Sequence, residues 1–157
     1  MKWAGMLLLG YAAFEILRRI CHAERCRLAQ ADGIYLLLLR LQSDICERGV
    51  PLDAIYRAFA HEALEKSGFL LSLRKEGLAR ALALHPPAVS ADACRELAFY
   101  ASGLGERFLE EERLCAAHIV SVWGEEVRRV HAELPRKLKL KKTVFMTGTG
   151  MLLLFLL

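Results

Sequence analysis

Charge is distributed very unevenly along this chain, and that constrains its fold more than any other feature. Every charged residue except Lys2 lies between two uncharged stretches, which run from residue 3 to 14 and from residue 143 to 157. A helix of about 15 apolar residues is roughly 22 Å long, shorter than a hydrocarbon core of about 30 Å. Flanking cations can reach outward to cover the difference. The sequence therefore predicts a transmembrane helix at each end, over residues 1–20 and 143–157.

Positive charge borders both predicted membrane segments. Arg18 and Arg19 follow the first segment, and a basic run without acids precedes the second: Arg136, Lys137, Lys139, Lys141 and Lys142. Such residues stay on the cytoplasmic side of a membrane, which predicts a cytoplasmic domain over residues 21–142. Each cation near an anionic lipid surface contributes about 1 kcal/mol. Membrane lipids are thus expected partners, whereas the aromatic-interleaved basic stripe of a nucleic-acid binder is missing.

A cleaved signal peptide is the rival interpretation of the N-terminal stretch. Lys2 and the apolar run after it have the required composition, but no convincing small-residue cleavage site follows. Arginines directly after the apolar run also oppose translocation. An uncleaved anchor is the better interpretation.

Between the two ends, the residues that typically start and end helices recur along the chain, and no strand-like alternation of apolar and polar residues is present. Gly49 suits a left-handed helix end, Pro51 a helix start and Ser90 an N-cap, while Pro135 predicts a helix end. These signals predict an all-α bundle with helices over about residues 24–47, 51–67, 69–84, 90–103 and 106–134. Along the last helix, apolar residues at 4-3 spacing form a coiled-coil-like seam that comprises Ala116, Val120, Trp123, Val127, Val130 and Leu134. Ile119 and Val122 widen this stripe beyond a simple dimer seam, so packing inside a helical bundle is at least as well supported.

Cysteines, histidines and acids are present, but their spacing does not match known metal-binding or catalytic motifs. Cys21, His22 and Cys26 give only three metal ligands, one fewer than a structural zinc site needs. The three acids at residues 110–112 fan around a helix start, where they favour the helix dipole as a solvated face. Phosphate-binding loops and nucleophile motifs are missing. We therefore predict a protein without catalytic residues, metal or cofactor, and five cysteines in a reducing cytoplasm argue against a disulfide framework.

Two sequence blocks carry a family resemblance, one over residues 36–60 and one over residues 96–112. They resemble the stage III sporulation protein AB family in order and separation, and the likeness extends over nearly the whole chain. The matching positions are Asp44, Ile45, Gly49, Pro51 and Leu52 in the first block and Leu97, Leu104 and Gly105 in the second. The chain differs from the family's usual pattern at Leu78, Phe108 and Glu112. The first block is also distantly similar to the F-domain of type II secretion platform proteins.

The resemblance implies a function that composition and spacing do not. It implies a non-enzymatic platform in the membrane of the mother cell around the forespore, within the channel complex required for endospore formation. The implied partners are other channel subunits and a cytoplasmic secretion-type ATPase. Two matters stay open at this point, namely self-association and the alternative of a small membrane-anchored regulator that senses a lipid or ligand.

Overall fold

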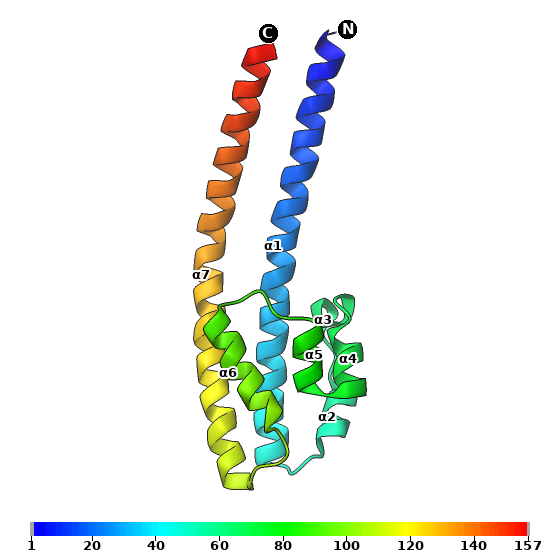
Figure 1. The fold of residues 1–157 in the computed structure, drawn as a ribbon, viewed down its shortest axis with the longest axis vertical. Helices are drawn as coiled ribbons and strands as arrows, with labels where there is room; N and C mark the ends of the chain where they lie inside the picture. The colour runs from blue at the N-terminus through cyan, green and yellow to red at the C-terminus, as the bar shows by residue number, and fades with distance from the viewer. Residues whose placement is uncertain (1, 157) are drawn as a thin grey trace. The chain divides into compact units, whose positions relative to one another are not determined.

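The protein is all-helical in the computed structural model, which describes the backbone of residues 2–156 and the side chains of residues 11–45 and 47–151. Its helices are α1 (Lys2–Cys46), α2 (Leu52–Ala58), α3 (Glu62–Lys66), α4 (Phe69–Glu76), α5 (Leu78–Leu84), α6 (Ala91–Ser102) and α7 (Leu109–Leu156). The chain divides into two compact units (Figure 1). Unit 1 comprises residues 1–26 and 131–157, and unit 2 comprises residues 27–130. The expectation of an all-α bundle is confirmed.

The core of unit 2 forms where α1, α6 and α7 pack together with the four short helices. In α1, Ile34, Leu37, Leu38 and Leu41 are all buried, at the spacing of one helix face. The predicted stripe of α7 also faces inward, because Ala116, Ile119, Trp123 and Val127 are buried, with Val120 packed beside them. The Trp123 indole Nε1 donates a hydrogen bond to the Ala31 carbonyl at 3.0 Å, which joins α7 to α1. Core packing of the predicted stripe is therefore confirmed from Ala116 to Val127, whereas Val122, Val130 and Leu134 are half-buried.

Two predicted helices are each split in two. The predicted helix over residues 69–84 breaks at Gly77, whose φ of +82° and ψ of 178° do not fit a helix. The predicted helix over residues 51–67 breaks between α2 and α3, although no glycine or proline marks the break. There the Arg74 guanidinium binds the Phe59 carbonyl at 2.9 Å and the Tyr56 carbonyl at 3.4 Å. Arg74 of α4 thus satisfies backbone carbonyls at the end of α2 that would otherwise lack a hydrogen-bond donor.

Gly33 is a point of close approach between α1 and α3. A Cβ at Gly33 would lie 2.6 Å from Nδ1 of His61 and 2.9 Å from Cγ of Leu64. The missing side chain therefore lets the start of α3 pack directly on α1. This close approach is the reason for a glycine in the middle of a long helix.

The prediction that Pro135 ends the last helix is wrong, because α7 continues through it to Leu156. Proline lacks the N–H of one helical hydrogen bond and costs the helix about 3 kcal/mol. Ending the helix would require a new, costly nucleation a few residues later. Continuing α7 through Pro135 therefore costs less free energy than ending it and starting a second helix. The N-cap at Ser90 is confirmed, since its Oγ accepts a hydrogen bond from the Ala93 N–H at 3.3 Å.

Within the part of the chain that the structure describes, no helix has a stretch both long and apolar enough to cross a membrane. Much of each predicted membrane segment lies outside the described side chains, namely residues 1–10 of the first and 152–157 of the second.

Candidate functional site

The two resemblance blocks meet at one end of unit 2, where the α1–α2 turn and the α6–α7 turn lie side by side (Figure 1). A Cβ built on Gly105 in the second turn would lie only 3.0 Å from Cδ1 of Leu52, the first residue of α2. Leu52 and Leu104 are half-buried against the core, and Leu97 is fully buried. Residues about 50 positions apart in the sequence thus form one structural feature, which we call the turn end.

The first turn is built by its glycine. Gly49 has a φ of +63°, and its N–H donates to the Ile45 carbonyl at 3.2 Å, which ends α1 in a left-handed cap. The Val50 N–H donates to the Asp44 carbonyl at 2.9 Å. Pro51 then directly precedes α2, and its carbonyl accepts the Ala54 N–H at 3.0 Å. The left-handed cap predicted at Gly49 is confirmed.

Asp44 has a structural role in this turn. Its side chain is only 7% exposed, and its carboxylate accepts from Arg40 at 2.7 Å and contacts Arg48 at 3.4 Å. A buried carboxylate without such partners would cost several kcal/mol. The two arginines offset its negative charge, so Asp44 holds the end of α1 as an ion-paired acid.

Arg107 organises the second turn. Its guanidinium donates to the Tyr100 and Phe99 carbonyls, each at 3.4 Å, and so caps the end of α6. It also lies 3.8 Å from Glu112. A Cβ on Gly103 would lie 2.3 Å from this guanidinium, so Gly103 gives it the space to reach the carbonyls.

The expectation that the acids at residues 110–112 form a solvated face is wrong for Glu112. Glu110 and Glu111 are exposed, but Glu112 is 3% exposed, and among the described residues no hydrogen-bond donor reaches its carboxylate. The Arg107 charge is what offsets its burial. Arg107 and Glu112 are five positions apart in the chain, which is not a helical spacing, so the pair could not be predicted from the sequence.

Tyr56 lies under the same end of the unit. Burial raises the pKa of Tyr56 to about 12; a backbone hydrogen bond with Leu78 opposes the rise, and the negative charge of Glu112 adds to it. Tyr56 is therefore a neutral phenol at physiological pH and shows no sign of acting as a base. Burial likewise raises the pKa of the Cys94 thiol, which keeps it protonated.

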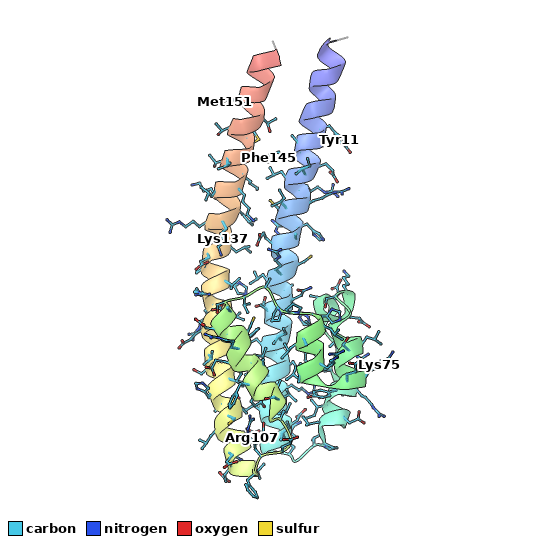
Figure 2. All side chains as sticks on the ribbon, viewed as in Figure 1. Tyr11, Lys75, Arg107, Lys137, Phe145 and Met151 are labelled. Atoms are coloured by element: carbon cyan, nitrogen blue, oxygen red, sulfur yellow. The ribbon has the colours of Figure 1, made fainter. Side chains whose placement is uncertain are left out.

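Two aromatic rings project from the turn end into solvent. Phe99 is 70% exposed and Phe108 is 83% exposed. The Arg107 guanidinium carbon lies 5.8 Å from the centroid of the Phe99 ring, within cation–π range, and Figure 2 shows Arg107 at the turn between α6 and α7. We call Phe99, Arg107 and Phe108 the aromatic patch. The patch was missed in the sequence analysis, although Phe108, three residues after Gly105 in a turn rich in charged residues, was a usable signal.

The predicted basic residues lie in unit 1. Arg18 contacts Glu15 at 4.0 Å, Lys137 pairs with Glu133 at 2.7 Å, and Lys141 pairs with Glu24. Arg136 and Lys139 are exposed on α7, on which Figure 2 also marks Lys137. Arg18, Arg19 and Lys142 line a cleft.

The cysteines and histidines give no further site among the described residues. Cys21, Cys94 and Cys115 are half-buried, Cys26 is exposed, and all four are free thiols. Cys26 Sγ lies 3.5 Å from Nε2 of His22, and the Cys46 side chain lies outside the described part. No group of three or more metal-binding side chains gathers in the described residues. No family model, no curated protein and no solved structure matches the chain.

Proposed function

We propose that the chain is a non-enzymatic, membrane-anchored platform whose helical unit 2 receives a soluble protein partner on the aromatic patch. The observation that carries this proposal is the exposure of Phe99 and Phe108 around a structurally fixed Arg107. Aromatic and arginine side chains supply most of the binding energy at protein interfaces.

The buried acids of unit 2 support a scaffold over an enzyme. Three carboxylates are buried, and each contacts an arginine: Asp44 with Arg40, Glu112 with Arg107 and Glu126 with Arg129. Glu126 also accepts the Ser90 N–H at 2.8 Å, which ties α7 to the start of α6. Glu126 thus joins two elements, Glu112 is paired across the α6–α7 turn, and Asp44 is paired at the end of its own helix.

The partner that the family resemblance implies is a cytoplasmic secretion-type ATPase of the mother cell–forespore channel. Glu106, Glu110 and Glu111 flank Phe108 in the chain and are exposed. Glu110 pairs with Arg113 at 3.1 Å, which leaves Glu106 and Glu111 as the acids beside Phe108 that favour basic residues on the partner surface. We therefore infer that the ATPase contact would weaken as salt rises.

Membrane anchoring rests on the sequence of the two ends. The uncharged stretches over residues 3–14 and 143–157 have cations beside them, and both stretches are helical over their described residues. Carbonate extraction of membranes should leave the full-length protein in the pellet, and protease added to the cytoplasmic side should digest residues 27–130. Complete release by carbonate would contradict the anchors.

A binding experiment tests the partner surface. Full-length protein in detergent is titrated with the candidate ATPase, as the unmodified chain and as the Phe99→Ser/Phe108→Ser variant. We expect the variant to raise Kd by tenfold or more, since hot-spot residues each contribute about 1–2 kcal/mol or more.

Leu71→Ser/Leu84→Ser is the matched control. These leucines are 60% and 48% exposed on α4 and α5, so the control removes exposed apolar surface from helices that do not form the two turns. It should leave Kd within about twofold of the unmodified value. Equal loss in both variants, or no binding by the unmodified protein, would refute the proposed interface.

A further inference from the structure

A cleft of about 530 Å³ lies within unit 1, between the helical turns of α1 at residues 14–25 and Lys142 of α7. Its volume falls in the range of about 300–1,000 Å³ that is usual for small-molecule sites. The lining is amphipathic, because Phe14 and Leu17 supply apolar surface and Arg18, Arg19, Arg25 and Lys142 supply positive charge. Such a lining suits a ligand with an anionic group and an apolar part.

Positive charge in the cleft exceeds negative charge by three. Glu15 is the one carboxylate among the lining residues, and it contacts Arg18 at 4.0 Å. Within the described residues, Arg19, Arg25 and Lys142 have no carboxylate partner. His22, also in the lining, adds a further ring nitrogen. Cations held together in this way repel one another unless an anion joins them.

The two walls of the cleft are joined by an ion pair. Lys141, next to Lys142, pairs with Glu24 on α1, one residue before Arg25. Glu24 is only 18% exposed, so the pair is shielded from solvent on one side. It fixes Lys142 opposite the arginines of α1, and the cations of the cleft thereby come from both helices.

We propose that this cleft binds the phosphate group of an anionic phospholipid. The inference rests on the proposed membrane anchors, because the cleft adjoins the positions where the uncharged stretches of α1 and α7 both end. That position corresponds to the headgroup layer. Basic pockets between membrane helices on the cytoplasmic side are recognised sites for acidic lipid headgroups. A soluble phosphate ester shares the same chemistry, so the experiment separates the two sources.

The test uses full-length protein in detergent micelles, titrated with dioctanoyl phosphatidylglycerol, dioctanoyl phosphatidylcholine or glycerol 1-phosphate, with thermal unfolding as the readout. The unmodified protein should bind the phosphatidylglycerol at least tenfold more tightly than either other ligand. Arg25→Gln/Lys142→Gln removes one cation from each wall and should raise the apparent Kd roughly 30-fold.

Two control variants isolate the cleft from general attraction. Arg136→Gln/Lys139→Gln removes the same charge from exposed positions of α7 outside the cleft, and should change Kd less than threefold. Arg25→Lys/Lys142→Arg keeps the charge and should retain binding, which shows that the site tolerates substitution and remains folded.

Three results would overturn the inference: equal loss in the exposed-position control, equal binding of phosphatidylcholine, or glycerol 1-phosphate binding as tight as that of the lipid. The last result would assign the cleft to a soluble phosphate ester. Carbonate extraction tests the anchors separately. Protein that stays in the membrane but shows no preference for the anionic lipid overturns the cleft proposal alone, whereas complete release overturns the proposed anchoring.

Discussion

Alanine substitution at Gly49 and Gly105 tests the construction of the turn end. Both glycines have a positive φ, +63° and +87°, which an L residue with a Cβ adopts at a cost of about 1–2 kcal/mol. Alanine also lowers the conformational entropy of the unfolded chain, which stabilises the folded state by about 0.4–1 kcal/mol. A Cβ on Gly49 would meet no atom within 4 Å. The expected loss for Gly49→Ala is therefore about 1 kcal/mol.

Gly105→Ala should cost more, because its Cβ would lie 3.0 Å from Cδ1 of Leu52. Leu52 is half-buried and its methyl group can shift, so the added cost lies at the low end of the about 1–3 kcal/mol found for overpacking. We expect a total loss of about 2 kcal/mol. The difference between the two variants thus measures the contact between the resemblance blocks, since both share the cost of a positive φ.

The assay is denaturant unfolding of the full-length protein in detergent, followed by Trp123 fluorescence in a Trp3→Phe background. Trp123 is fully buried, so its emission reports on unit 2. Leu52→Ala should relieve the contact, which predicts a coupling of about 1 kcal/mol in a double-mutant cycle with Gly105→Ala. Equal losses at both glycines, with no coupling to Leu52, would refute the close approach of the two turns.

Three further predictions concern other contacts of unit 2. Arg107→Ala leaves Glu112 buried without a counter-charge and should lower the unfolding free energy by about 3 kcal/mol, whereas Arg107→Ala/Glu112→Leu should recover part of it in the same assay. Because the pKa of Tyr56 is raised to about 12, the folded state is favoured below pH 10 and loses up to about 2–3 kcal/mol as pH rises from 10 to 12. Tyr56→Phe should remove that part of the pH dependence, and an unchanged slope would contradict burial of the phenol. Trp123→Phe loses the bond to Ala31 and should cost about 1–3 kcal/mol by circular dichroism, while a neutral effect would argue against this contact.

Local signals in the sequence predicted most of the helical fold, and tertiary contacts account for the failures. The caps at Gly49 and Ser90 depend on neighbouring residues alone, so they could be read from sequence. The break after α2 depends on Arg74, which reaches the carbonyls of Tyr56 and Phe59 from another helix. Gly77 was visible in sequence, but a single glycine inside a helical pattern does not reveal its φ.

The candidate site shows the same limit at the level of single side chains. The resemblance drew attention to Leu52 and Gly105 separately, while their contact appears only once the chain is folded. Burial of Glu112, and not of Glu110 or Glu111, depends on which side of α7 faces Arg107. The rotation of a helix about its axis follows from all of its packing partners, so no short window of sequence specifies it.

Because the aromatic patch and the basic cleft belong to different units, the two proposals can fail independently. Phe99→Ser/Phe108→Ser removes apolar surface without touching charge in unit 1, and Arg25→Gln/Lys142→Gln removes charge without touching unit 2. A platform that binds a partner and a lipid by separate surfaces should lose one interaction in each variant and keep the other. If the cleft variant also lost the partner, the lipid site would be energetically coupled to unit 2. The protein would then behave as the lipid-sensing regulator that the sequence left as the alternative, because reciprocal coupling between two binding sites defines such a sensor.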